Sequence, residues 1–113
     1  MSAVFVSNLI INTGATFSQS FDLLNSDSSG PLNLDGFTVA SQFRKHAGSS
    51  TKTDFTTEIT DSSNGQISIS LSSTQTAAIS KPGRYVYDVV INSGTVKTRV
   101  IEGSVLVREG VTK

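Results

Sequence analysis

The stretch Arg84-Tyr85-Val86-Tyr87-Asp88-Val89-Val90-Ile91 is the most hydrophobic segment of the chain and decides its fold class. Its aromatic and aliphatic side chains alternate with period two, which is typical of a β-strand. Because both faces of the segment carry apolar residues, we expect a central strand. Such a strand is covered on both sides, or on one side by the core and on the other by a partner chain.

Short strands separated by turn residues are predicted on both sides of this segment. After it, Asn92-Ser93-Gly94 predicts a tight hairpin, and residues 95–108 predict a long strand in which Gly103 marks a bulge or bend. Before it, Lys81-Pro82-Gly83 ends a single helical turn at residues 72–80. Asn64-Gly65 is a hairpin signal between two of the earlier strands. Those earlier strands are predicted at residues 3–11, 15–24, 37–44, 54–60 and 66–71.

This pattern predicts an all-β fold. We expect an antiparallel β-sandwich with immunoglobulin-like packing, about seven to eight strands and one short helical turn, forming a single domain over residues 1–113. The N-terminal run 3–11 is hydrophobic for an edge segment. We expect it either to be buried in the sandwich or to pair with a neighbouring subunit.

The composition excludes several classes of function. Nine Lys and Arg balance nine Asp and Glu, there is no Cys and one His, and Ser and Thr make up 32 of the 113 residues. Thiolate and multi-histidine metal sites are therefore excluded, and the zero net charge argues against nucleic-acid binding. No apolar run approaches the roughly 18 residues of a membrane span, and the N-terminus lacks the pattern of a signal peptide.

Asp88 is the residue most in need of a partner, because it lies within the most apolar strand. We expect an ion pair or hydrogen bond with Arg44 or Arg99 on a neighbouring strand, in a buried setting. Tyr85 follows the Lys81-Pro82-Gly83 turn, and Tyr87 comes two residues later. Sandwich domains often place at this corner a tyrosine whose hydroxyl bonds back to the preceding connection, so both tyrosines are predicted to be structural.

Arg44, Lys45, His46 and Lys52 form a basic cluster around a Gly- and Ser-containing loop. We interpret it as a solvated loop, with contact between Lys45, His46, Lys52 and an acidic partner chain as the alternative. No phosphate loop, dinucleotide fingerprint, calcium loop, nucleophile–base pair or carboxylate pair is recognisable. We therefore expect no enzyme activity, no cofactor and no metal.

The segment Leu34-Asp35-Gly36-Phe37-Thr38-Val39-Ala40-Ser41-Gln42-Phe43-Arg44 resembles the L-[TD]-G-[YF]-T-V-x-x-Q-[IF]-R segment of small structural proteins of tailed phages. Further matches follow in the family's order, so that the resemblance covers about residues 3–112. The chain is similar to N-terminal domains of the baseplate-upper-protein type, including those of marine and cyanobacterial phages. The later matches are residues 65–72, 74–79, 82–89 and 94–99, Glu102-Gly103 and Val111-Thr112.

The resemblance implies a non-enzymatic virion protein of the tail, baseplate or neck. Such a protein docks in many copies onto other virion proteins of a symmetric assembly, without nucleic acid, membrane or small-molecule substrate. In the baseplate-type relatives this module heads a longer chain, so its occurrence alone favours an adaptor, sleeve or decoration role over receptor binding. The alternatives are a capsid decoration protein that bridges shell subunits and a host-surface carbohydrate-binding module. The absence of Trp disfavours the carbohydrate-binding module.

Overall fold

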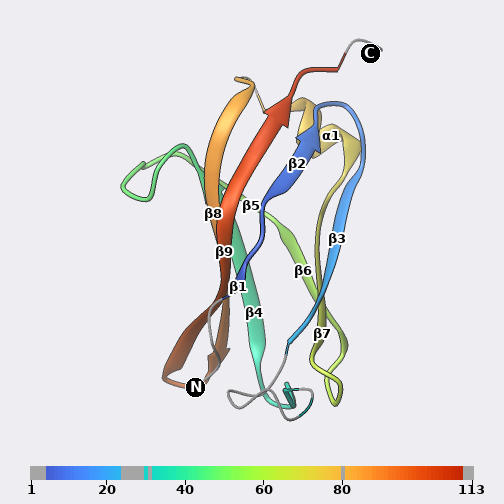
Figure 1. Cartoon of the computed structure of the whole chain (residues 1–113), viewed down its shortest axis with the longest axis vertical. Coiled ribbons are helices and arrows are strands. Elements are labelled where there is room, and N and C mark those ends of the chain that lie inside the picture. Colours follow the sequence, from blue (N-terminus) through green and yellow to red (C-terminus); the bar gives the residue numbers. More distant parts are fainter. Residues whose placement is uncertain (1–4, 24–29, 31, 80, 111–113) are drawn as a thin grey trace.

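The computed structural model describes residues 5–23, 30, 32–79 and 81–110. Two sheets pack face to face in an elongated sandwich with extents of 44 × 27 × 22 Å (Figure 1). The elements are, in chain order, β1 (Phe5–Val6), β2 (Leu9–Asn12), β3 (Phe17–Asp22), β4 (Thr38–Arg44), β5 (Lys52–Asp54), β6 (Thr56–Asp61), β7 (Gln66–Leu71), α1 (Ser73–Ala77), β8 (Gly83–Ser93) and β9 (Val96–Arg108).

The larger sheet, called sheet A below, has the strand order β1-β9-β8-β4-β5, with β2 also paired to β9, and sheet B has the order β3-β7-β6. In an immunoglobulin sandwich the B, E and D strands share one sheet and the C, F and G strands share the other. Strands β3, β7 and β6 occupy the first set of positions, and β4, β8 and β9 occupy the second. The predicted all-β, immunoglobulin-like sandwich is confirmed.

The N-terminal strand departs from the antiparallel expectation. β1 and β2 pair with β9 in parallel, while the other paired strands are antiparallel. A short hairpin can join only antiparallel strands. After β2 the chain crosses to β3 in the other sheet and does not return directly to β9, so β2 can pair with β9 in parallel. The run predicted at 3–11 is thus paired within its own chain, with Leu9 and Ile11 buried. Its residues 3 and 4 lie outside the described residues, as do Leu24 and residues 111–113.

The core is formed by the inward-facing positions of both sheets. Five aromatic rings contact one another there, and the Phe43 ring contacts those of Phe55 and Tyr85 at centroid distances of 5.2 and 5.4 Å. The other two rings are those of Phe17 and Tyr87. The largest fully buried side chains are Phe43, Ile11, Leu23, Leu34, Ile67, Ile69, Leu71, Ile101, Val89, Val100, Val105 and Val107.

Two strands differ from their predicted course. The strand expected at 54–60 is divided at Phe55 between β5 of sheet A and β6 of sheet B. The buried Phe55 donates its backbone N–H to the Ser41 carbonyl at 2.9 Å and carries the chain across. In β9 the bulge lies at Val100, because Val89 pairs with Ile101 while Val90 pairs with Arg99. Of the bulge or bend predicted at Gly103, the bulge is therefore wrong, since Gly103 pairs regularly with Tyr87.

The predicted helical turn is present as α1. Ser72 caps it, accepting a hydrogen bond from the Gln75 N–H at 3.1 Å, while the Gln75 side chain accepts from the Ser72 N–H at 2.8 Å. The buried Thr76 hydroxyl donates to the Ala15 carbonyl and accepts from the Gly14 N–H, which ties α1 to the β2–β3 turn. Within the described ranges, no helix is long and apolar enough to cross a membrane.

Candidate functional site

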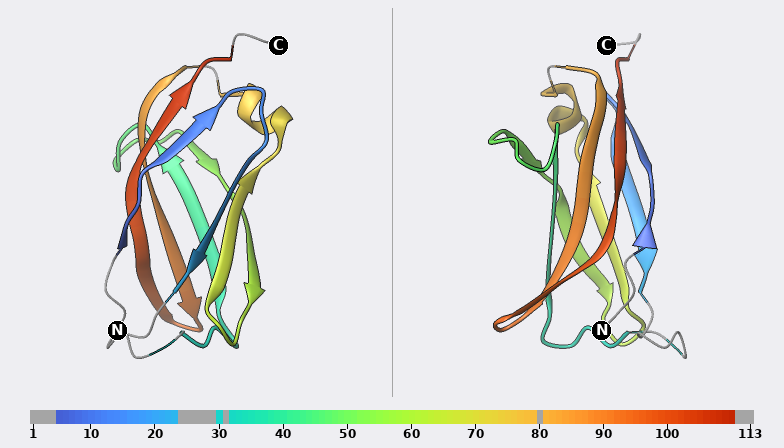
Figure 2. Two further views of the ribbon diagram at one scale, coloured as in Figure 1. Left: turned by 45° about the vertical axis from the view of Figure 1, so that its right-hand side comes forward. Right: turned by 60° about the vertical axis from the view of Figure 1, so that its left-hand side comes forward.

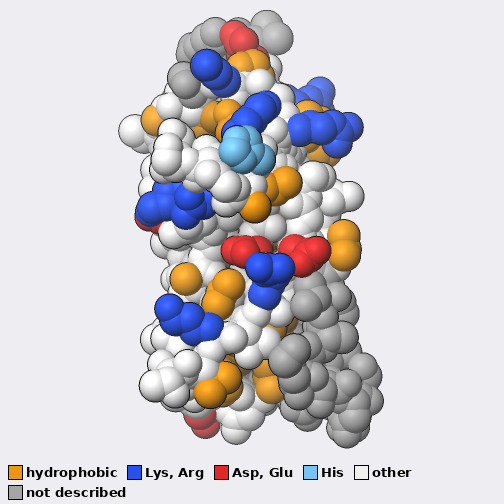
Figure 3. Space-filling view, turned by 90° about the vertical axis from the view of Figure 1, so that its left-hand side faces the viewer, with side chains coloured by type: hydrophobic (Ala, Val, Ile, Leu, Met, Phe, Trp, Pro, Cys, Tyr) orange, Lys and Arg blue, Asp and Glu red, His pale blue; other side chains and the backbone are white. Residues whose placement is uncertain are grey.

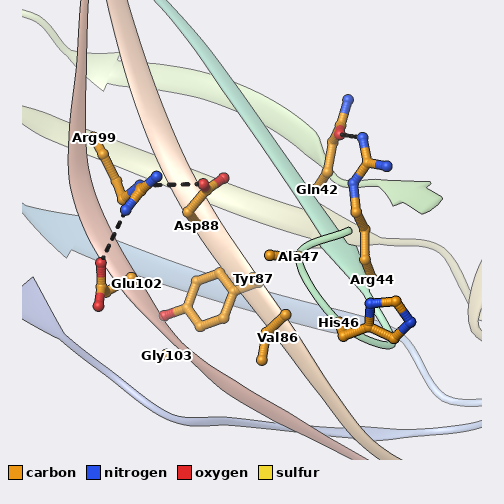
Figure 4. Close-up of a pocket in the computed structure, with 10 residues that line it drawn as sticks. All are labelled: Gln42, Arg44, His46, Ala47, Val86, Tyr87, Asp88, Arg99, Glu102 and Gly103. Atoms are coloured by element: carbon orange, nitrogen blue, oxygen red, sulfur yellow. Dashed lines mark hydrogen bonds and ion pairs between the residues drawn. The ribbon is translucent and has the colours of Figure 1, made fainter. Parts of the chain in front are cut away.

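An open depression of about 640 Å³ lies on the outer face of sheet A. The β4–β5 loop projects from this side of the molecule and borders the depression (Figure 2). Because the depression is formed by β4, β8, β9 and this loop, it brings together residues far apart in the chain. Its lining residues are Gln42, Arg44, His46, Ala47, Val86, Tyr87, Asp88, Arg99, Glu102 and Gly103 (Figure 4).

Arg99 bridges two carboxylates in this depression. Asp88 and Glu102 lie directly opposite each other on β8 and β9, where two like charges repel. Arg99 lies between them, with Nε 3.4 Å from Asp88 Oδ2 and Nη1 3.4 Å from Glu102 Oε1 (Figure 4). Residues three apart on a regular strand point to opposite faces, but the bulge at Val100 turns Arg99 and Glu102 to the same face.

Asp88 is therefore paired with Arg99, one of its two predicted donors, but not in the buried setting that we expected. The side chains of Arg99 and Asp88 are 58% and 40% exposed, because the outer face of β8 is not covered by the described part of the chain. The other predicted donor, Arg44, instead bonds to the Ser49 carbonyl and to Gln42 Oε1, so it holds the β4–β5 loop against β4.

The two tyrosines have structural contacts. The Tyr85 hydroxyl donates to the Lys81 carbonyl at 2.6 Å, four residues upstream, which is the geometry of a tyrosine corner. The Tyr87 hydroxyl donates to the Ser7 carbonyl at 2.7 Å and so joins β8 to the connection between β1 and β2. Burial raises the pKa of Tyr87.

Gly103 marks a close approach of two backbones. A Cβ atom at this position would lie 2.0 Å from the Ser7 carbonyl oxygen, which also accepts the Tyr87 bond. Beside it, Asn8 Oδ1 accepts from both the N–H and the hydroxyl of Ser104 at 3.1 Å. We call this arrangement of Ser7, Asn8, Tyr87, Gly103 and Ser104 the seam.

The basic residues around the β4–β5 loop are divided among separate environments. The Lys45 ammonium lies 5.0 Å from the centre of the Tyr85 ring, and Lys52 Nζ lies 2.9 Å from Asp54 Oδ2. The hydrogen bond from Lys52 lowers the pKa of Asp54. His46 lies exposed at the rim of the depression. Among the described residues, no group of three or more His, Cys, Asp or Glu is placed to hold a metal ion.

Sequence reasoning missed two features of this face. The Arg99–Glu102 pair depends on the bulge, at which the consecutive residues Val100 and Ile101 are both buried. Exposed aliphatic side chains at the edge were also missed: Val6 is 74% and Ile10 53% exposed, although both lie in a hydrophobic run.

The fold places the chain in the class of immunoglobulin-like β-sandwich domains, here with an open, charged sheet face. The model of the LtfC-like β-sandwich domain matches residues 5–108, and the chain belongs to that family. A search of curated proteins found no significant match. Among solved structures, the crystal structure of InlP from Listeria monocytogenes is similar, with a TM-score of 0.52 and 16% identity. The match covers 95% of this chain and 28% of that one, so the likeness concerns the fold alone.

Proposed function

We propose that the protein is a non-enzymatic structural component of a tailed-phage particle. It belongs to the tail, baseplate or neck, where it docks as a small sandwich onto a symmetric assembly. The match of the LtfC-like family model to residues 5–108 carries this proposal, because the family name is associated with phages. The ordered resemblance to phage structural proteins over the same residues supports it.

The outer face of sheet A suits a docking role. Exposed Val6, Ile10 and Val86 are interspersed there with charged side chains, a mixture found at protein interfaces. Both carboxylates of the depression are paired with Arg99, and the Arg44 guanidinium is bonded to the loop. These charged groups are thus bonded to other groups of the same chain, which favours a role in protein contact over a role in catalysis.

The test is to locate the chain in purified particles of the phage that encodes it. Mass spectrometry is expected to find the chain in banded particles at a fixed ratio to a tail or baseplate protein. Labelled antibody is expected at the tail end in electron micrographs. Absence from particles while the chain is present in the lysate would overturn the proposal, and label over the shell would replace the tail position with capsid decoration.

A matched pair of variants connects particle incorporation to sheet A. Val6→Asp places a charge on the exposed edge of this face, whereas Val96→Asp places it on a comparably exposed valine at the β8–β9 hairpin. Loss of incorporation with Val6→Asp alone, at an unchanged melting temperature, is the expected result. Equal incorporation of both variants would contradict docking through sheet A.

A further inference from the structure

The zero net charge of the chain conceals a separation of charge between its two outer faces. Alternation and register place six basic side chains and three acidic ones on the outer face of sheet A (Figure 3). This face has a formal excess of three positive charges. The basic residues are Arg44, Lys52, Arg84, Lys97, Arg99 and Arg108, and the acidic residues are Asp54, Asp88 and Glu102.

The outer face of sheet B has the opposite character. Its outward positions on β3, β6 and β7 are hydroxyl side chains together with Gln66, Asp22 and Glu58, and Asp61 ends the row that contains Asp22 and Gln66. Within the described residues, no Lys or Arg occupies an outward position of these three strands. Hydrogen bonds from Asn64 and Ser63 lower the pKa of Asp61, which keeps it ionised. Sheet B thus carries three negative charges.

We propose that copies of this chain associate head to tail, with the outer face of sheet A of one copy on the outer face of sheet B of the next. The opposite charges attract in this arrangement, whereas contact between two sheet A faces or two sheet B faces brings like charges together. Because the two faces lie on opposite sides of the sandwich (Figure 1), two joined copies together retain one free face of each kind. Such a heterologous contact repeats into a ring or an open stack.

The size and texture of the faces fit this contact. Sheet B has three strands of six residues each, so its face is about 20 Å long and about 14 Å wide. A contact of that size lies below the roughly 800 Å² per partner of a standard interface, which fits a weak association that depends on salt. The short Ser and Thr side chains of sheet B present hydroxyl groups that accept hydrogen bonds from the arginines of sheet A.

This inference deepens the proposed function, since it names a second copy as the partner in the particle. Its test is made in solution on the purified full chain and is independent of particles. A chain that is present in particles but monomeric in solution at low salt would overturn the head-to-tail contact and leave the proposed function standing. A chain that assembles in solution but is absent from particles would overturn the proposed function and leave the head-to-tail contact standing.

Sedimentation velocity first measures association as a function of ionic strength. The Debye length is about 30 Å at 0.01 M and about 3 Å at 1 M salt. We expect species larger than a monomer at the lower salt concentration and monomer at the higher one. Monomer at both concentrations, or association that does not change with salt, would overturn the proposal.

Two neutralised variants then separate the faces. Arg84→Gln with Lys97→Gln alters sheet A, and Asp22→Asn with Glu58→Gln alters sheet B, all at exposed positions. Each variant alone is expected to lose association at low salt, while an equimolar mixture forms a dimer that grows no further. This dimer joins the one intact sheet A face of the mixture to its one intact sheet B face.

Lys81→Gln is the control, because Lys81 lies in the connection before β8 and outside both faces. It is expected to associate like the unaltered chain. If the sheet B variant associated like the unaltered chain, or if the mixture contained no dimer, the contact would not be head to tail. Unchanged melting temperatures establish that each variant is folded.

Discussion

The two sheets are alike on their inner faces and different on their outer faces. Inside, Ile67, Ile69 and Leu71 of sheet B and Val89 and Ile101 of sheet A are all buried at alternating positions. Outside, sheet B carries Ser and Thr with a few carboxylates, whereas sheet A carries Arg, Lys, paired acids and exposed aliphatic side chains. The inward-facing residues of each strand therefore specify the sandwich, and the outward-facing residues are available for contacts.

The sheets also differ in how their edges are closed. The N-terminal edge of sheet A depends on the seam, where the Ser7 carbonyl occupies the space above Gly103. Sheet B is a regular three-stranded ladder with one register shift, between Ile59 and Asp61 in β6. The following experiments test the closure of this edge of sheet A and the likeness of the two inner faces.

The largest effect is expected for Gly103→Val. Its side chain would collide with the Ser7 backbone, so β1 and β2 would have to leave β9. We expect a loss of about 4 kcal/mol or more in unfolding free energy, at the upper end for point mutations. Urea unfolding measures it, with Gly30→Ala as control because a Cβ at Gly30 meets no atom of the described residues within 4 Å. Similar midpoints for the two variants would refute the close packing of the seam.

Truncations in the core test the likeness of the inner faces. Ile69 of sheet B is 0% exposed and Ile101 of sheet A is 1% exposed. Ile69→Ala and Ile101→Ala are each expected to lower the unfolding free energy by about 2–5 kcal/mol, because each leaves a cavity in the same core. Chemical denaturation of both variants measures this. A loss confined to one of them would show that the two sheets contribute unequally to the core.

Tyr87→Phe tests the polar part of the seam. The Ser7 carbonyl loses its bond from the hydroxyl, at an expected cost of about 1–3 kcal/mol. Burial raises the folded-state pKa of Tyr87 above the ordinary 10.0, so the folded chain holds this proton more tightly than the unfolded chain. The corresponding stability is complete below pH 10.0 and is lost as the pH rises through the folded-state pKa.

Thermal unfolding between neutral and strongly alkaline pH measures this dependence. The decline of the unaltered chain at high pH is expected to be shallower in Tyr87→Phe. An equally steep decline would mean that Tyr87 ionises as easily in the folded chain as in the unfolded one.

Smaller effects are expected on the outer face of sheet A. Asp88→Ala removes an exposed ion pair and also the repulsion between Asp88 and Glu102, so the loss should stay below about 1 kcal/mol. A buried ion pair at Asp88 would instead give a clear fall in melting temperature when Asp88 is replaced. Arg99→Ala is expected to cost more than Asp88→Ala, because it leaves two facing carboxylates uncompensated. Calorimetry at low salt measures both, and the reverse order would contradict the bridging role of Arg99.

The smallest effect is expected for the pKa values of one carboxylate from each sheet, Asp54 of sheet A and Asp61 of sheet B. The pKa of Asp54 is lowered mainly by a hydrogen bond from Lys52, and that of Asp61 by hydrogen bonds from Asn64 and Ser63. Their stabilisation is present above the ordinary pKa of 3.8 and is lost as the pH falls through the folded-state values. NMR titration in about 1 M salt is expected to diminish the Asp54 shift, because its partner is charged, and to leave the Asp61 shift unchanged.

The sequence predicted the features that depend on local patterns. Alternation located the strands, and Asn64-Gly65 located the β6–β7 hairpin. The position of Tyr85 after Lys81-Pro82-Gly83 predicted a bond back to the preceding connection, and the structure identifies its acceptor as the Lys81 carbonyl. Features that depend on two distant segments were missed. The role of Gly103 depends on Ser7, and the division of the strand at Phe55 depends on Ser41 in the neighbouring strand.

The candidate site was predictable only in part for the same reason. Asp88 and its possible partner Arg99 were recognised, but their exposure was not, because nothing local to β8 shows which of its faces is covered. The separation of charge between the two sheets was hidden by the zero net charge. It becomes visible only when each charged residue is placed on its face.

The parallel pairing of β1 and β2 with β9 has a mechanical consequence. The two strand ends concerned are the start of β1, which lies beside the middle of β9 at Ile101 and Glu102, and the end of β9, which lies near one end of the long axis (Figure 1). A force that pulls these two ends apart slides β1 and β2 against β9, so it loads all of their backbone hydrogen bonds at once in shear. The bond from the Tyr87 hydroxyl to Ser7 resists the same displacement. The seam therefore resists sliding of β1 and β2 along β9.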